Sequence, residues 1–331
     1  MKTLIVTAIG SFSASAVIRS CREAGYRVVG TDIHPQKLLA EGREADHFVR
    51  VPRFDAGERY IKALRELAAE EHAEGILPLT DAELDILNRE RERFFPTQLW
   101  VSPEEAVLRA RDKRRSREAA EKVFADAALK EKFFCIPTIL LSGAPEEMRR
   151  LSAQLPLILK PFDGRSSEGL YRVRTEVELR RALAEIWIAD AEERYLAQPM
   201  IPGRVVCVDT VRFSDGHCVA APREEFRRTA NGAGLAVHVF RDALLESACA
   251  ALSAALDIRG CVNYEFIHEP SGCYYFLECN PRFSGGTGFS VAAGCDVVKL
   301  HLSVFSGRAA GEAQEAKDCW IAKKYIEVLT K

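Results

Sequence analysis

Short apolar runs and amphipathic stretches alternate along the first hundred residues. The apolar runs are rich in β-branched side chains, and between them apolar positions recur every three or four residues, as in 60–68. Runs of the first kind are typical of buried strands, and stretches of the second kind are typical of helices that cover a sheet. The alternation predicts an α/β domain, a parallel sheet with helices on its faces. The predicted strands are 3–9, 26–31, 48–51, 75–79 and 98–101.

A different pattern begins after Pro137. A strand-like run at 157–161 is followed by a loop rich in glycine and serine, and strands then predominate up to a hairpin at 261–278. Hairpins mixed with helices predict an antiparallel α+β region. Within it, the run 218–221 is expected to end at Pro222.

Two helix starts carry a capping pattern. Ser102 and Thr175 each stand three residues before a glutamate, and Pro103 suits the first turn of a helix. In a capping box the hydroxyl accepts a hydrogen bond from the backbone three residues on, and the glutamate accepts one from the capping residue. Both Ser102 and Thr175 are therefore expected to cap helices.

The charge balance excludes several classes of function. The 331 residues carry 46 Lys and Arg against 48 Asp and Glu, so the net charge is −2. A general nucleic-acid binder needs a strongly basic face, and no apolar run approaches the ~20 residues of a membrane span. The first ten residues are interpreted as a buried strand rather than a signal peptide, because their apolar stretch is too short. We expect a cytoplasmic protein that binds neither nucleic acid nor membrane.

Ten cysteines raise the question of disulfides or a metal site. They form no Cys-x-x-Cys pair and show no zinc-finger spacing with histidine. Most of them lie within apolar runs, which is typical of reduced cysteines that fill a core. We therefore expect most of them to be buried and reduced.

The hairpin near the C-terminus gathers acidic and amide side chains. If its turn closes symmetrically on four residues, 265 lies opposite 276, and Glu278 and Asn280 share the face of Glu265. Glu278 is then diagonal to Glu265, roughly 7 Å away. Two carboxylates and an amide oxygen on one patch favour Mg²⁺, which prefers oxygen ligands. The alternative is a solvated hairpin face with ordinary charges.

An arginine follows this patch directly. Pro281 biases Asn280 towards an extended backbone, so that Arg282 is expected to project from the same side as the acids. There its guanidinium would lie next to an anion held by the metal. We therefore treat Arg282 as the candidate catalytic cation.

The segment Glu278-Cys279-Asn280-Pro281-Arg282, after a hairpin strand that carries an acid, resembles the ATP-grasp superfamily. The likeness is strongest to its branch that is similar to carbamoyl phosphate synthase, and it extends over nearly the whole chain. It implies a Rossmann-like domain before the grasp (1–108), a small lobe with the phosphate loop (109–200) and a large lobe with the magnesium hairpin (201–331).

The resemblance also implies individual roles. Glu265, Glu278 and Asn280 match the family's Mg²⁺ ligands, and Arg282 matches its transition-state cation. The residues that would bind ATP are Lys113, Lys160, Gly164, Ser166 and Ser167 at the phosphates, and Gln198, Pro199 and Ile201 at the adenine. Val205 stands where many members place a glutamate that holds the ribose. Without the resemblance, Lys113 would be interpreted as a surface lysine of a charged run.

Two further sites stay open. Gly10 and Asp32 are spaced as in a dinucleotide-binding turn, but Gly-x-Gly-x-x-Gly is missing, so we do not expect NAD binding. Gly10 and Asp32 could instead shape a turn, or the loop 10–13 could face a substrate. Arg223 is a candidate for binding the second substrate, because guanidinium groups hold carboxylates and phosphates through two hydrogen bonds. Against this, Arg223 could belong to a charged loop with paired acids.

The resemblance implies an ATP- and Mg²⁺-dependent ligase, which activates a small carboxylate as an acyl phosphate and joins it to an amine. One alternative is phosphorylation of bicarbonate or carbamate, as in carbamoyl phosphate synthase, which would need a partner subunit. A second is a nucleotide-binding sensor without catalysis. A homodimer or a partner subunit is left open.

Overall fold

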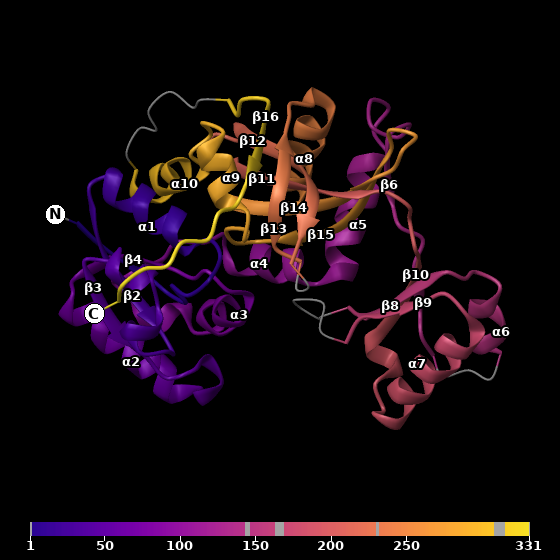
Figure 1. Ribbon diagram of the computed structural model, residues 1–331, viewed down its shortest axis with the longest axis horizontal. Coiled ribbons are helices and arrows are strands. Elements are labelled where there is room, and N and C mark those ends of the chain that lie inside the picture. Colours follow the sequence, from indigo (N-terminus) through magenta and orange to yellow (C-terminus); the bar gives the residue numbers. More distant parts are fainter. Residues whose placement is uncertain (1, 143–145, 163–168, 230–231, 308–314, 331) are drawn as a thin grey trace.

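Figure 1 shows a chain that is divided into three bodies. The computed structural model describes residues 2–142, 146–162, 169–229, 232–307 and 315–330. The N-terminal domain lies beside a large lobe, and a small lobe stands apart from the N-terminal domain on the other side. The predicted arrangement of one α/β domain followed by two α+β lobes is confirmed.

The N-terminal domain is a five-stranded, fully parallel sheet in the order β3-β2-β1-β4-β5. The predicted alternation is confirmed, because helices follow β1, β3 and β4 and bury their apolar faces on the sheet. The strand order changes direction between β1 and β4, and ligands bind at the carboxyl edge of such sheets near this point. Its elements are β1 (Lys2–Val6), α1 (Ala14–Glu23), β2 (Tyr26–Asp32), β3 (His47–Arg50), α2 (Glu58–Glu70), β4 (Ala73–Leu77), α3 (Asp81–Arg89) and β5 (Gln98–Leu99).

The small lobe is a four-stranded antiparallel sheet in the order β7-β10-β8-β9, covered by two helices. The predicted cap at Thr175 is confirmed: its side chain and that of Glu178 form a capping box at the start of the second helix. The elements are β7 (Ile139–Leu140), α6 (Glu147–Ser152), β8 (Leu157–Pro161), β9 (Tyr171–Val173), α7 (Glu176–Ile188) and β10 (Tyr195–Pro199).

The large lobe is a seven-stranded sheet in the order β16-β13-β12-β11-β14-β15-β6. Its strands are β6 (Phe133–Cys135), β11 (Arg204–Arg212), β12 (Cys218–Arg228), β13 (Gly234–Val239), β14 (Gly260–His268), β15 (Tyr274–Asn280) and β16 (Cys319–Ala322). The helices packed with it are α4 (Glu104–Arg111), α5 (Lys113–Phe124), α8 (Ala243–Ala255), α9 (Thr287–Ala292) and α10 (Val297–Ser306). All ten cysteines are free, and most are buried.

Three expectations differ from the structure. The whole segment 109–200 was expected to form the small lobe. Two of its elements belong to the large lobe instead, because α5 packs on α8 and β6 pairs with β15. β12 does not end at Pro222 but continues to Arg228, and Pro222 lies opposite Val208 in its interior. The Ser102 hydroxyl bonds the backbone of Arg259 instead of capping a helix. In each case a partner distant in sequence decides the local structure.

A buried histidine joins the N-terminal domain to the large lobe. His301 of α10 accepts a hydrogen bond from the Cys261 amide at Nδ1 (2.9 Å), and its Nε2 donates to the Trp100 carbonyl (3.1 Å). The ring must therefore be neutral, with its proton on Nε2. Burial lowers the pKa of His301 to about 3.

The protein should therefore lose stability in mild acid. The unfolded histidine has a pKa of about 6.5, so between the two values the unfolded state binds more protons and stability falls as pH falls. From about pH 6.5 to pH 5, this one group should cost about 2 kcal/mol. Urea unfolding at both pH values measures the change. His301→Gln should reduce it, whereas His217→Gln, in an exposed turn, should leave it unchanged; equal slopes in all three proteins would contradict the prediction.

Candidate active site

The two acids of the hairpin lie directly opposite each other. Glu265 on β14 pairs with Glu278 on β15, and Asn263 pairs with Asn280. The predicted register, with 265 opposite 276, is wrong for two reasons. The turn is one residue longer than assumed, since His268 pairs with Tyr274, and the register shifts again between Glu265 and Phe266. The correction brings the carboxylates closer than a diagonal pair would be.

These acids share one amide. The Asn280 Nδ2 lies 3.3 Å from Glu265 Oε1 and 3.3 Å from Glu278 Oε1. Burial, reinforced by the charge of Glu278, raises the pKa of Glu265 to about 7. Burial also acts to raise the pKa of Glu278, but the nearby ammonium groups of Lys113 and Lys160 outweigh it and hold that pKa below its usual value.

The cluster fits a hard divalent cation. Its ligands would be two carboxylates and an amide oxygen, the donor set that Mg²⁺ prefers. The repulsion that raises the pKa of Glu265 is what a bound cation would relieve. In the described part of the chain, no three His, Cys, Asp or Glu side chains gather as a metal site, so Asn280 would have to supply the third ligand. The Asn280 oxygen faces Arg282 here (3.4 Å), so it would ligate a cation only with its amide turned over.

Two lysines approach the acids from other elements. Lys113 is the first residue of α5, whose start is capped by Asp112, and its Nζ lies 3.6 Å from Glu278 Oε2. Lys160 lies near the end of β8 in the small lobe. Burial lowers the pKa of Lys160 to about 8, and the charge of Lys113 acts in the same direction. The two lobes therefore bring two cations to one carboxylate.

A cavity of about 240 Å³ lies between the two lobes, next to these lysines. Lys113, Lys160 and Gln198 line it, together with Phe276 and Leu277 of the large lobe. The Gln198 side chain is oriented by a 2.9 Å hydrogen bond to Thr138, which also lines the cavity.

The remaining predicted ATP ligands are not all brought to this cavity. Of the described residues, neither Pro199 nor Ile201 is among those that line it. Val205 lies on β11 opposite Ile267. Gly164, Ser166 and Ser167 lie outside the described residues. The phosphate and adenine roles stay predictions.

Removing the small-lobe lysine should weaken ATP binding. Lys160→Ala deletes a half-buried cation that lines the cavity, and a hydrogen bond to a charged group contributes about 1.5–3 kcal/mol. Calorimetric titration should show a Kd for ATP raised by about 10- to 100-fold. Lys122→Ala, on an exposed position of α5, is the control and should bind as wild type. Equal affinities for ATP in all three proteins would show that Lys160 does not contribute to ATP binding.

Arg282 is held by the N-terminal domain. Its Nη2 and Nε lie 2.8 and 3.1 Å from the two carboxylate oxygens of Asp81, the first residue of α3. Its Nη2 also donates to Asn280 (3.4 Å) and its Nη1 to the Phe283 carbonyl (3.2 Å). Arg282 therefore lies beside the metal-ligand candidates, as expected, and is bound to an aspartate that sequence analysis did not single out.

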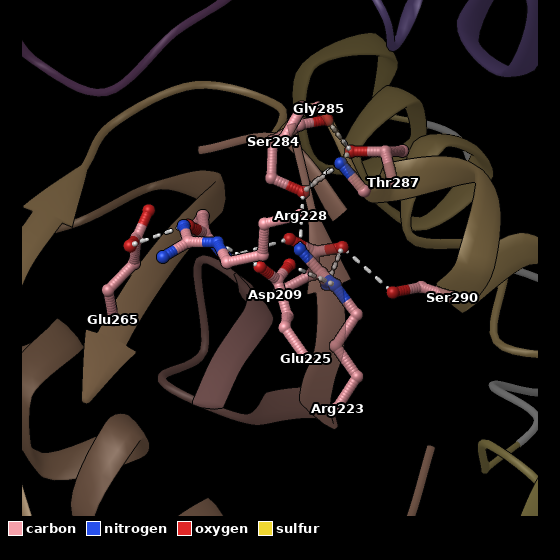
Figure 2. Close-up of polar contacts among 12 residues, drawn as sticks. Asp209, Arg223, Glu225, Arg228, Glu265, Ser284, Gly285, Thr287 and Ser290 are labelled. Carbon is pink, nitrogen blue, oxygen red and sulfur yellow. Dashed lines mark hydrogen bonds and ion pairs between the residues drawn. The ribbon is translucent and has the colours of Figure 1, made fainter. Parts of the chain in front are cut away.

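Arg223, the candidate for the second substrate, is buried in a network shown in Figure 2. Its guanidinium pairs with Asp209 and donates to the Ser284 hydroxyl, both at 2.8 Å. Ser290 donates to the same Asp209 oxygen. The side chain of Arg223 is 1% exposed, so its contacts are with the protein interior.

The next arginine of this network reaches the metal-ligand candidates. Arg228 Nε lies 2.6 Å from Glu225, and its Nη2 lies 3.5 Å from Glu265 (Figure 2). Its side chain is 29% exposed, so it offers a cation at the surface of the site where Arg223 does not. The sequence singled out Arg223 and not Arg228, because β12 was expected to end at Pro222, directly before Arg223. The charged run 223–228 was the available signal.

Gly10 and Asp32 have a structural role. The Gly10 amide donates to one oxygen of Asp32 (2.9 Å), and the His34 amide donates to the other (2.9 Å). Asp32 therefore shapes the loops at the carboxyl edge of the sheet.

Comparison with known proteins places the chain. Residues 191–327 match a family model described as "ATP-grasp in the biosynthetic pathway with Ter operon", and residues 4–99 match "PylC-like, N-terminal domain". The C-terminal part of the chain is therefore similar to ATP-grasp proteins, and its first domain is similar to the N-terminal domain of PylC-like proteins. The chain is 26% identical over 308 residues to the carbamoyl phosphate synthase large chain of Thermus thermophilus. The match covers 88% of this chain and 28% of that one.

Solved structures share the fold of this chain. The biotin carboxylase domain of Hydrogenobacter thermophilus 2-oxoglutarate carboxylase, solved with MgADP and bicarbonate, has a TM-score of 0.75 at 19% identity. It matches 96% of this chain and 73% of that one. The N5-carboxyaminoimidazole synthetase of Staphylococcus aureus, complexed with ADP, has a TM-score of 0.73 at 16% identity, covering 95% and 80% of the two chains. Among the described residues, no helix is long and apolar enough to cross a membrane.

Proposed function

We propose that this protein is an ATP-grasp ligase, dependent on ATP and Mg²⁺, that activates a small carboxylate as an acyl phosphate and joins it to an amine. The observation that carries the proposal is the convergence of Glu265, Glu278 and Arg282 beside Lys113 and Lys160, two residues that line the cavity between the lobes. Cations for phosphates, acids for a metal and an arginine for the reacting group meet there.

The chemistry requires two displacements. A carboxylate oxygen attacks the γ-phosphorus of ATP, and the bond to ADP breaks. The amine then attacks the acyl carbon, the carbon–oxygen bond breaks, and phosphate leaves with the former carboxylate oxygen while the amine loses a proton. A bound Mg²⁺ would neutralise phosphate oxygens, and the protein contributes mainly positioning and charge.

The residues of this chain divide the task. Lys113 and Lys160 would hold the nucleotide phosphates, and Glu265, Glu278 and Asn280 would hold Mg²⁺. Arg282 would meet the charge that develops on the transferred phosphoryl group. Arg228, held by Glu225 beside Glu265, would bind the carboxylate that is to be activated.

Oxygen transfer tests the proposal. Small carboxylates labelled with ¹⁸O are offered in pairs with amines, and the phosphate released with ADP is analysed by mass spectrometry. The proposal expects one ¹⁸O atom in each phosphate. Release of unlabelled phosphate would show that water, not the carboxylate, attacks ATP. Binding of ATP without formation of ADP for any pair would favour the sensor alternative.

One observation favours a second candidate. The carbamoyl phosphate synthase relatives match most of this chain, although the chain spans only about 28% of the length of the first of them. A kinase step on bicarbonate or carbamate, completed by a partner subunit, is therefore the runner-up. ADP formation that requires bicarbonate and that no organic carboxylate supports would favour this second candidate.

A further inference from the structure

Asp81 connects the N-terminal domain to the candidate catalytic arginine. It lies at the carboxyl edge of the parallel sheet, in the first turn of α3, and its side chain is 9% exposed. Both of its carboxylate oxygens contact the Arg282 guanidinium, Oδ2 at 2.8 Å and Oδ1 at 3.1 Å. Such a bidentate pair fixes the plane of a guanidinium as well as its position.

The carboxylate of Asp81 is itself held firmly. Arg111 of α4 lies 3.4 Å from Asp81 Oδ1 and forms a second, bidentate contact with Asp85 at 3.0 and 3.3 Å. One turn of α3 thus presents two acids to two arginines. The start of α3 is fixed in turn by Thr80, whose side chain accepts a hydrogen bond from the Glu83 amide.

The base of α3 is anchored to the sheet as well. Glu83 is buried, and its carboxylate accepts hydrogen bonds from Thr7 at the end of β1 (2.8 Å) and from Tyr60 of α2 (3.0 Å). Asp81 therefore projects from a rigid part of the N-terminal domain. Arg282 faces that domain with its Nε and Nη2 atoms. On the other side of the guanidinium, Nη2 also donates to Asn280 and Nη1 donates to the Phe283 carbonyl.

We propose that Asp81 is a positioning residue, through which the N-terminal domain sets the orientation of Arg282 for phosphoryl transfer. The inference rests on the proposed function. A guanidinium on a flexible stem would lose rotamer freedom on meeting the transferred group, and Asp81 restricts it in advance. Pre-orientation of this kind acts mainly on kcat, because it matters at the reacting centre and not at the nucleotide.

The test measures kcat, KM for the carboxylate and Kd for ATP in Asp81→Asn. We expect kcat to fall by about 10- to 100-fold, the usual effect of losing a partner that orients a functional group. The Kd for ATP should change by less than about twofold. Asp85→Asn is the matched control, because Asp85 binds the same Arg111 in the same turn of α3, and it should keep wild-type turnover. An equal loss in both variants would mean that the turn matters only for folding, and would overturn the proposal.

A double-mutant cycle separates orientation from stability. In a chain that already carries Arg282→Lys, Asp81→Asn should lower kcat little further, since the oriented guanidinium is gone. Full additivity would overturn the proposal. If Asp81→Asn does not fold, Asp81→Glu keeps the charge and moves it by one methylene; a stable variant with lowered kcat supports the proposal, and wild-type kcat overturns it.

The outcomes also distinguish this inference from the proposed function. Wild-type turnover in folded Arg282→Lys would overturn the catalytic role of Arg282 and the positioning role with it. Lost turnover in Arg282→Lys together with wild-type kcat in Asp81→Asn would overturn the positioning role alone.

Discussion

Replacing Glu278 with glutamine should abolish Mg²⁺-dependent turnover of ATP and leave the fold intact. Glutamine keeps the size of the side chain but removes the charge that faces Glu265 across the hairpin and that attracts Lys113 and Lys160. Even the outer partners of a metal site contribute about 10- to 100-fold to affinity or activity, so loss of a direct ligand should lower turnover by at least about a hundredfold.

The structure explains why the fold should survive this change. The Glu278 side chain is 33% exposed, and its contact with Lys113 at 3.6 Å is a partly solvated ion pair. Such pairs contribute at most about 1 kcal/mol to stability. Removal of one of two opposed carboxylates also relieves repulsion within the hairpin.

The measurement is ADP formation across a Mg²⁺ titration, with thermal melting followed by circular dichroism. Glu269→Gln, in the turn of the same hairpin, is the matched control and should keep wild-type turnover. A folded Glu278→Gln protein with normal turnover at saturating Mg²⁺ would remove Glu278 from the metal site.

The features of the fold that could be predicted from the sequence are those whose interacting residues lie close together along the chain. The parallel sheet, the hairpin and the Thr175 cap were predictable, because their signals are local: period, turn residues and a three-residue spacing. The grouping of Glu265, Glu278 and Asn280 followed from the hairpin alone. Its register did not, because nothing in the local pattern marked the shift between Glu265 and Phe266.

The contacts between bodies were beyond such reasoning. Asp81 and Arg282 are separated by 201 positions, and an aspartate in the first turn of a helix has an ordinary local role there. Ser102 had every local feature of a helix cap, yet its hydroxyl forms a hydrogen bond with the backbone of Arg259, 157 residues away. Arg223 looked like a surface cation because its buried partners, Asp209 and Ser284, come from other strands and loops.

Arg282→Lys should keep ATP binding and lose most of the catalytic rate. The guanidinium is fixed on one edge by Asp81 and lies within hydrogen-bond distance of Asn280, so its position relative to the metal-ligand candidates is set by two elements, α3 and β15. A planar fork can hold two oxygens of a transferred phosphoryl group, whereas an ammonium group offers a point charge. Loss of one preorganised donor costs about 10²- to 10³-fold in kcat.

The effect should fall on the transition state because charge develops there, and interactions made only in the transition state change kcat rather than affinity. Calorimetry should therefore give a Kd for ATP within about twofold of wild type, while kcat falls strongly.

A structural arginine would behave in the opposite way. Lysine cannot reproduce the bidentate contact with Asp81, so the variant would melt earlier, yet the folded fraction would turn over normally. Arg111→Lys, which alters the other guanidinium bound to Asp81, shows how much of any change in melting comes from that aspartate alone. Normal kcat in folded Arg282→Lys would leave the proposed ligase without its catalytic cation.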